Sequence, residues 1–254
     1  MKKTDTLQEL VELSRYLGRP EKEYVIMAEG NTSARIDTNT FYIKASGHSM
    51  ANIDDTGFLE MRLNPIIEIF QQLDVSDEDI AQVYESARVN PEVNSRPSLE
   101  TILHALALTR CNAQYIGHTH PIAMQSILCS NMADELLKGR IFSEEVTFCG
   151  VAPAIVPYGD PGLGLARKFA QTLDDYVEQY GRTPHLVLIK NHGLIAIGHS
   201  AQEVKNITDM SGKVARVLLG TAGLGGPVFL SEEEVRRIDT RPDEIIRLKK
   251  LGSR

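Results

Sequence analysis

Short apolar segments alternate with amphipathic stretches along this chain, and this alternation limits the available folds more than any other feature. A helix is predicted over 6–17, where Leu10, Leu13 and Leu17 recur at helical spacing before Gly18 and Pro20 end the pattern. Further helices are predicted over 97–110, 122–139, 162–180 and 201–219, and strands over 24–27, 34–36, 41–44, 115–120, 146–156, 185–190 and 194–197. This order of elements predicts an α/β fold.

Length, charge and cysteine content narrow the class of protein. The 254 residues carry no internal repeat, long linker or change of composition, so the sequence predicts a single domain. Lysine and arginine number 27 against 34 acidic residues, and this net charge of −7 argues against a nucleic-acid-binding surface. No apolar run reaches the roughly 18–20 residues of a membrane span. The absence of a secretory signal and of paired cysteine motifs predicts a cytoplasmic protein with reduced thiols.

Two histidines separated by one residue carry the strongest chemical signal. In a strand, residues i and i+2 point to the same face, so His118 and His120 can converge on one point. His192, in a predicted turn between two apolar segments, is a third candidate ligand. Three histidines that leave one position open are typical of catalytic zinc sites. Alternatively, His118 and His120 are hydrogen-bonded residues at the end of a strand.

Glu100 is the candidate acid or base. The predicted helix cap is Ser98, which would place Glu100 on the first helical turn. Two structural interpretations remain open. An acidic residue complements the helix dipole at this position, and His104 lies four residues further on the same helix face, where it could pair with Glu100.

Two turns of small residues are candidate anion-binding sites. The segments 30–33 and 46–47 offer backbone N–H groups and hydroxyls, Ser98 adds donors at a helix start, and Lys44 is close in sequence. Neither segment matches a P-loop or a Gly-x-Gly-x-x-Gly fingerprint, so nucleotide binding is not indicated. Both segments could also be ordinary turns.

Taken together, five segments of the chain resemble one known family. They are Gly30-Asn31-Thr32-Ser33-Ala34-Arg35, Lys44-Ala45-Ser46-Gly47, Pro97-Ser98-Leu99-Glu100 with His104, His118-Thr119-His120-Pro121 and Asn191-His192-Gly193-Leu194. Their order and spacing are similar to those of the class II aldolase/adducin family from about residue 7 to residue 219. The resemblance implies a three-layer α/β/α sandwich around a mixed, largely antiparallel sheet. It also implies one domain over 1–254, with a tail over 220–254, and a cyclic homotetramer whose metal site lies near a subunit interface.

The resemblance also implies a role for each matching residue. His118, His120 and His192 correspond to the metal ligands, and Glu100 to the acid/base carboxylate. Tyr158 stands where the aldolases carry an active-site tyrosine. The phosphate-binding positions are Gly30, Asn31, Ser46, Gly47 and Ser98. Two positions depart from the sugar-phosphate aldolases: Leu99 replaces a second hydroxyl residue, and no tyrosine follows Tyr180.

The function implied is that of a zinc-dependent class II aldolase, an aldehyde-lyase of carbohydrate metabolism. It would cleave a ketose or ketose phosphate into a dihydroxyacetone-type fragment and an aldehyde, by stabilising an enediolate. An epimerase or a decarboxylase of the same family is the alternative within enzymes. A non-catalytic, adducin-like oligomeric binding module is the alternative outside them. Because adducin heads lack the metal-binding histidines, the complete trio here favours an enzyme.

Overall fold

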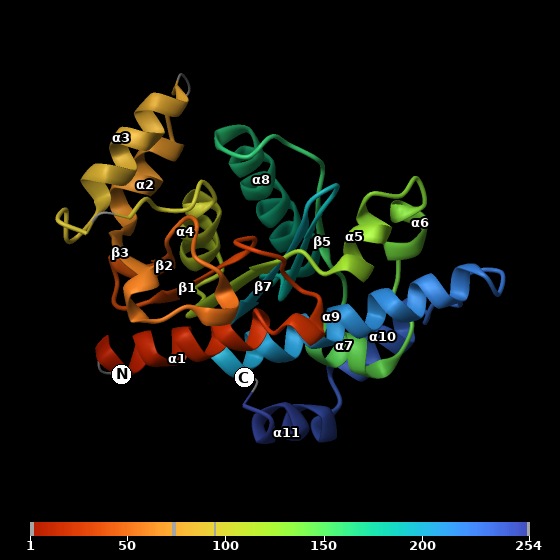
Figure 1. The fold of residues 1–254 in the computed structure, drawn as a ribbon. Coiled ribbons are helices and arrows are strands. Elements are labelled where there is room, and N and C mark those ends of the chain that lie inside the picture. Colours follow the sequence, from red (N-terminus) through yellow and green to blue (C-terminus); the bar gives the residue numbers. More distant parts are fainter. Residues whose placement is uncertain (1–2, 73–74, 94, 253–254) are drawn as a thin grey trace.

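The computed structural model describes residues 3–72, 75–93 and 95–252, and its centre is a sheet of seven strands (Figure 1). The strand order is β3-β2-β1-β4-β7-β6-β5. The strands are β1 (Asn31–Arg35), β2 (Thr40–Lys44), β3 (Phe58–Arg62), β4 (Tyr115–Thr119), β5 (Ala154–Val156), β6 (Leu186–Ile189) and β7 (Gly193–Gly198). All neighbours are antiparallel except β5 and β6, which confirms the mixed, largely antiparallel sheet.

Helices cover both faces of this sheet. They are α1 (Lys3–Leu17), α2 (Leu63–Phe70), α3 (Asp77–Ala87), α4 (Thr101–Arg110), α5 (Ile122–Leu128), α6 (Ala133–Leu137), α7 (Ser143–Cys149), α8 (Leu163–Tyr180), α9 (Ala201–Ala222), α10 (Glu232–Asp239) and α11 (Pro242–Lys250). Figure 1 shows α1 and α9 on one side of the sheet and α4 and α8 on the other. In the described part of the chain, no helix combines the length and apolar composition that crossing a membrane requires.

Two separate hydrophobic cores result from the alternation of side chains along the strands. On β6, Val187 and Ile189 pack into the core that contains α4 and α8. Leu186 and Leu188, on the opposite face of the same strand, pack into the core that contains α1 and α9. Because a sheet buried on both faces needs a helical layer on each, these cores confirm the three-layer sandwich.

The strand predicted over 24–27 is wrong, because this segment forms a loop. Ile26 is 53% exposed and Met27 is 86% exposed, and Met27 has a left-handed φ of 55°. The backbone at the start of this segment is hydrogen bonded to the residues that follow β4 and not to a neighbouring strand. The carbonyls of Glu23 and Tyr24 accept hydrogen bonds from the N–H groups of Ile122 (3.2 Å) and His120 (2.8 Å). The apolar residues of this segment therefore belong to a loop that is hydrogen bonded to the residues following β4 and lies outside the sheet.

Two other predictions missed an element boundary. The segment 146–156 was expected to be strand-like, but residues 146–149 end α7, and only residues 154–156 form a strand. Gly150, with a φ of 80°, ends that helix because its left-handed backbone favours glycine. The helix predicted over 122–139 is two short helices, α5 and α6.

Candidate functional site

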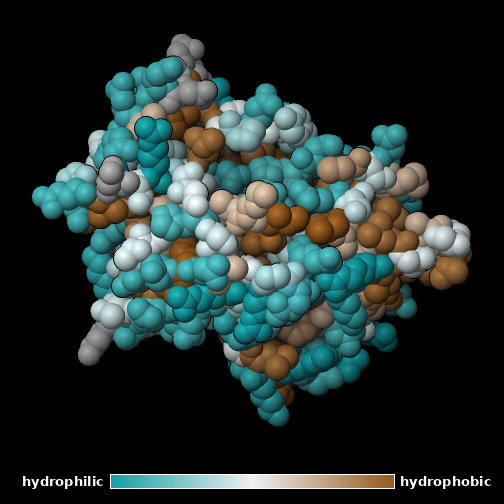
Figure 2. All heavy atoms as spheres, in the orientation of Figure 1, coloured by the Kyte–Doolittle hydropathy of each residue, from teal (hydrophilic) through white to brown (hydrophobic). Residues whose placement is uncertain are grey.

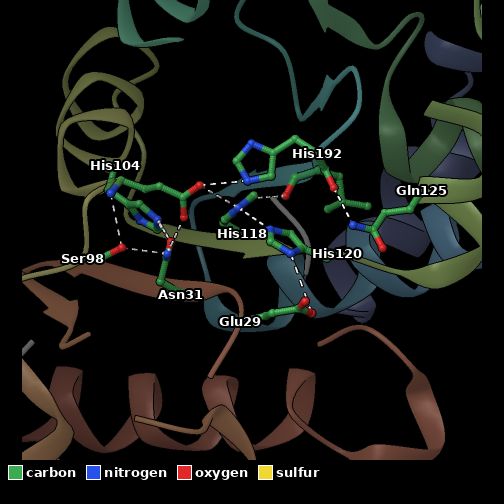
Figure 3. Close-up of polar contacts among 10 residues, drawn as sticks. Glu29, Asn31, Ser98, His104, His118, His120, Gln125 and His192 are labelled. Atoms are coloured by element: carbon green, nitrogen blue, oxygen red, sulfur yellow. Dashed lines mark hydrogen bonds and ion pairs between the residues drawn. The ribbon is translucent and has the colours of Figure 1, made fainter. Parts of the chain in front are cut away.

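The three candidate histidines meet at the end of β4. His118 is in β4, and His120 follows the strand directly. Strand β7 pairs antiparallel with β4, with Leu194 opposite Thr119, so the turn before β7 brings His192 to the same place. The three imidazole centroids are 4.7 to 4.9 Å apart (Figure 3). One ring nitrogen of each lies within 4.8 Å of the others, which is the arrangement of a candidate metal site.

The turn that carries His192 is fixed by its neighbours. Asn191 adopts a left-handed φ of 56°, which asparagine tolerates better than most residues. The side chain of Gln125 donates a hydrogen bond of 2.8 Å to the His192 carbonyl. A Cβ atom at position 193 would lie 2.5 Å from the Thr119 carbonyl oxygen, so only glycine lets β7 start this close to β4. His192 is thus presented by a rigid turn.

The chemistry of this donor set fits a divalent metal ion. The fully buried His118 ring donates from Nδ1 to the Leu194 carbonyl at 2.9 Å, which leaves Nε2 facing the cluster. There it lies 2.9 Å from Nε2 of His120. Burial, together with the two neighbouring imidazoles, lowers the pKa of His120 to about 3, so this ring is neutral. Burial acts to lower the pKa of His118, but the neighbouring Glu100 carboxylate raises it, so a positive charge is favoured at this ring. A metal ion that displaces the proton would supply this charge, and imidazoles beside a carboxylate are suitable zinc ligands.

Glu100 lies next to this cluster. Its Oε1 atom is 3.2 Å from Nε2 of His118 and 3.0 Å from Nε2 of His192. Its Oε2 atom accepts a 2.7 Å hydrogen bond from Nδ2 of Asn31 (Figure 3). Burial acts to raise the pKa of Glu100, but His118 and His192 hold this pKa well below its usual range. The group is therefore a carboxylate, held between the histidines and β1.

Ser98 does not cap α4, contrary to the expectation. The helix begins at Thr101, and Glu100 occupies the cap position before the first turn. The Ser98 hydroxyl instead accepts a 3.3 Å hydrogen bond from the Glu100 N–H, so it closes a turn that precedes the helix. The N–H of Ile102, within the first turn, donates to the Tyr84 hydroxyl of α3 at 3.0 Å. An acceptor from α3 was not foreseen, because capping by a distant side chain leaves no local sequence signal.

The five predicted phosphate-binding residues lie around the ends of β1 and β2. Of the turn predicted over 30–33, only Gly30 lies outside a strand, because β1 begins at Asn31. The Nδ2 atom of Asn31 donates a hydrogen bond of 3.1 Å to the Ser98 hydroxyl. The Ser46 N–H donates to the carbonyl of Arg96 at 2.9 Å, so the turn of Ser46 and Gly47 lies beside the segment that leads to Ser98. Gly30 has a φ of 66°, and a Cβ there would lie 2.7 Å from the His118 carbonyl. These turns therefore border the histidine cluster.

Lys44 is a charged group near these turns whose importance the sequence did not reveal. It is only 2% exposed at the end of β2, and its ammonium donates to the carbonyls of Ala28 (3.3 Å) and Ala45 (3.5 Å). Burial lowers the pKa of Lys44 to about 8, against the attraction of Glu100. Among the described residues, no carboxylate forms an ion pair with it. The sequence signal that could have indicated this buried cation was a lysine between the apolar residues Ile43 and Ala45.

Two further positions of interest lie away from the cluster. Tyr158 is 52% exposed, and its hydroxyl donates to Asp160 at 2.8 Å, so the structure does not bring this side chain to the histidines. Leu99 is 73% exposed beside Ser98 and Glu100, and only its backbone is anchored, through the Tyr84 hydroxyl that donates to its carbonyl at 3.3 Å.

Comparison with known proteins agrees with this fold. The family model described as "Class II Aldolase and Adducin N-terminal domain" matches residues 8–219. The chain therefore belongs to the class II aldolase/adducin family, whose enzymes include aldolases and a dehydratase. The substrates named for two of these enzymes, methylthioribulose 1-phosphate and L-fuculose 1-phosphate, are sugar phosphates.

The chain is similar to two bacterial proteins in sequence and to one enzyme in structure. It is 27% identical over 206 residues to the "Uncharacterized oxidoreductase YuxG" of Bacillus subtilis (strain 168). This match covers 77% of the present chain but only 27% of the length of that relative. It is 26% identical over 219 residues to the methylthioribulose-1-phosphate dehydratase of Bacillus pumilus (strain SAFR-032), covering 80% of this chain and 86% of the relative. An L-fuculose 1-phosphate aldolase has the same fold, with a TM-score of 0.70 and 20% sequence identity. The match covers 94% of the present chain and 96% of the aldolase chain.

Proposed function

We propose that this protein is a metal-dependent class II aldolase. Its reaction would cleave a ketose or ketose phosphate into a dihydroxyacetone-type fragment and an aldehyde. The observation that carries the proposal is the Glu100 carboxylate, which touches His118 and His192 at 3.2 and 3.0 Å beside the three-histidine cluster. A carboxylate next to a candidate metal site is suited to proton transfer at a carbon whose neighbouring oxygen is polarised.

The histidines would hold one divalent ion per chain, which we propose to be zinc. When bound, the metal supplies Lewis-acid stabilisation of negative charge that develops on the substrate's oxygens. The hydrogen bond from His118 to the Leu194 carbonyl orients that ring toward the cluster. Outer contacts of this kind usually keep a ligand histidine in one tautomer.

The turns around β1 and β2 would hold the phosphate end of the substrate. The hydroxyls of Ser46 and Ser98 supply donors, and Gly47, with open space where a Cβ would lie, leaves room for the substrate's close approach. The Asn31 amide holds the Ser98 hydroxyl in place, and Gly30 lets the chain pass close to the His118 carbonyl. Lys44, beneath these turns, supplies the positive charge that a phosphate dianion requires. Binding at this end fixes the reacting carbons relative to Glu100.

Because its pKa is depressed, Glu100 is a carboxylate before substrate binds, so its first role is that of a base. In cleavage it would accept the proton of the C4 hydroxyl as the C3–C4 bond breaks and the aldehyde forms, and it would then return this proton to C3, the carbon that becomes electron-rich. Tyr158 lies outside this set of residues, and the proposal gives it no step within one chain.

We further propose that residues 1–254 act as one cytoplasmic domain and assemble into a homotetramer. Three exposed apolar side chains lie near His120: Ile26 (53% exposed) and Met27 (86%) on the preceding loop, and Ile122 (44%) at the start of α5. Figure 2 shows apolar side chains gathering on this face of the molecule. Exposed apolar surface beside the site supports contact with a neighbouring chain there.

A second candidate is dehydration of a sugar phosphate, favoured by the similarity to a methylthioribulose-1-phosphate dehydratase over 86% of its length. The same carboxylate would then remove a proton next to a carbonyl, and a hydroxyl group would leave in place of the C–C bond. An epimerase or decarboxylase of the same family would use the same residues. A non-catalytic binding module would need no metal.

One experiment separates these candidates. Purified protein is analysed for metal and then incubated with a panel of ketose phosphates and the matching free ketoses. Metal-dependent release of an aldehyde supports the aldolase. Loss of water without carbon–carbon cleavage would identify a dehydratase. Absence of both stoichiometric metal and turnover would leave the binding module. The Glu100→Gln variant, prepared in parallel, controls for a contaminating enzyme.

A further inference from the structure

His104 is a fully buried polar residue that the proposed reaction does not use. It lies on α4, four residues after Glu100, yet the two side chains do not form the expected pair. Nδ1 of His104 instead lies 2.7 Å from the Ser33 hydroxyl, and Nε2 is hydrogen bonded to Oδ1 of Asn31 (Figure 3). Both partners belong to β1, so His104 connects α4 to the sheet directly behind Glu100.

The direction of each hydrogen bond follows from the orientation of the Asn31 amide. Its Nδ2 atom donates to Oε2 of Glu100 at 2.7 Å and to the Ser98 hydroxyl at 3.1 Å. The Asn31 carbonyl oxygen then faces His104, whose Nε2 must carry the proton. In a neutral ring Nδ1 is therefore bare and accepts from the Ser33 hydroxyl. Burial lowers the pKa of His104 to about 3, which agrees with a neutral ring.

We propose that Ser33, His104 and Asn31 form a directional hydrogen-bond chain that orients Glu100, and that His104 is its positioning residue. The inference rests on the proposed function, because it assumes that Glu100 does chemistry. Ser33 donates to His104, His104 donates to the Asn31 carbonyl oxygen, and the Asn31 NH₂ group donates to Glu100. The bond from His104 favours the orientation in which the Asn31 amide presents its NH₂ group to the carboxylate.

The amide of Asn31 has two possible orientations of nearly equal shape. If His104 could not donate, the amide could rotate and turn its oxygen toward Oε2 of Glu100, where two acceptors would repel each other. The second NH₂ contact, to the Ser98 hydroxyl at 3.1 Å, would be lost in the same rotation. A base displaced by about 1 Å can cost roughly 10²-fold in rate.

Packing alone does not explain a histidine at this position. The neighbours on α4, Leu103 and Leu106, are buried and apolar, whereas His104 faces the polar side chains of Ser33 and Asn31. Burying an imidazole is favourable only when both ring nitrogens have partners. The polar contacts to Asn31 and Ser33 therefore explain why position 104 carries a histidine.

Two matched substitutions test the positioning role. The amide nitrogen of a glutamine can occupy the place of Nε2 and still donate to Asn31, whereas asparagine reaches only the place of Nδ1, beside Ser33. We expect His104→Asn to lower kcat by about 10²-fold while His104→Gln retains activity within about fivefold. Metal content and melting temperature should match between the two variants. Equal losses of kcat in matched, folded variants would overturn the inference.

The protonation state provides a test that needs no substrate. Histidine-selective ¹⁵N NMR of the protein at neutral pH should show His104 as the Nε2–H tautomer, with its signals assigned by their loss in His104→Gln. An Nδ1–H tautomer would overturn the chain direction. If the wild-type protein turns over no substrate while the Nε2–H tautomer is found, the proposed function fails and the hydrogen-bond chain stands.

Discussion

The two ends of the candidate site are built in opposite ways. At the histidine end, the side chains of His118 and Glu100 are 0% and 13% exposed, and contacts with β1, β4 and β7 hold them in place. At the anion end, Ser46 and Gly47 lie in an exposed turn, and Leu99 is 73% exposed. Fixed, buried groups suit a chemical step, and open turns suit a ligand that must enter and leave. Substitutions at the first end should therefore reduce turnover, and those at the second should alter affinity.

The largest effect is expected from His120→Ala, which removes a ligand from the histidine end. The variant should lose its metal and lose activity by about 10³-fold or more, because Lewis-acid stabilisation is worth several kcal/mol. The fold should survive, since His120 follows β4 and does not lie in a core. Metal analysis and circular dichroism check both statements. His199→Ala, in an exposed loop, is the matched control. Full metal retention in His120→Ala would contradict the assignment.

Glu100→Gln should have the next largest effect. We expect kcat to fall by about 10²–10⁴-fold with little change in KM, because a general acid/base acts on the chemical step. The amide keeps the shape of the side chain, so the loss of dipole interaction at the start of α4 should cost at most about 1 kcal/mol. Steady-state kinetics and a melting curve measure the two quantities. Near-normal kcat with full metal would remove the acid/base role.

Lys44→Met should separate affinity from stability at the anion end. Loss of the buried cation should raise KM for a phosphorylated ketose by about tenfold or more, because charge-assisted hydrogen bonds are worth about 1.5–3 kcal/mol. KM for the matching free ketose should change little. Equal effects on the phosphorylated and free sugars would show that Lys44 does not bind the phosphate.

The same substitution should stabilise the fold. The pKa of Lys44 falls from 10.5 to about 8, so the unfolded chain binds more protons between these pH values, and wild-type stability rises with pH across this window. Below pH 8 the penalty is about 3 kcal/mol, and Lys44→Met removes it. Urea denaturation at pH 7 and pH 10 should show a stability gain that is larger at pH 7. If the variant were less stable than the wild type at pH 7, this would contradict the conclusion that burying the charged Lys44 side chain costs stability.

The smallest effect is expected from Leu99→Ser, which adds a hydroxyl donor to the open end. A neutral hydrogen bond contributes about 0.5–1.5 kcal/mol, so KM for a phosphorylated ketose should fall by about two- to tenfold. Leu99→Ala, which removes the same apolar surface without adding a donor, is the control. If both variants behave alike, the phosphate does not approach position 99.

The contrast between the two ends also explains what the sequence could predict. The convergence of His118 and His120 follows from the two-residue period of a strand, and a turn between two apolar strands was enough to suggest His192. The partners of His104 could not be predicted, because they depend on how α4 packs across β1. Val25 and Ile26 are apolar enough to indicate a strand. Only the hydrogen bond from His120 to the Tyr24 carbonyl shows why the segment is a loop.

Both edges of the central sheet are closed to further strands. At one edge β5 has three residues, and Pro153 and Pro157, which lack an N–H donor, flank it. At the other edge, the segment after α3 covers β3, where the Val89 N–H donates to the Glu60 carbonyl at 3.0 Å and Arg88 pairs with Met61. An uncovered strand is a template for sheet extension and aggregation. Among the described residues, both edges of the sheet therefore disfavour the strand-by-strand growth of aggregates, and helices and loops are the surfaces better suited to contacts between copies of this chain.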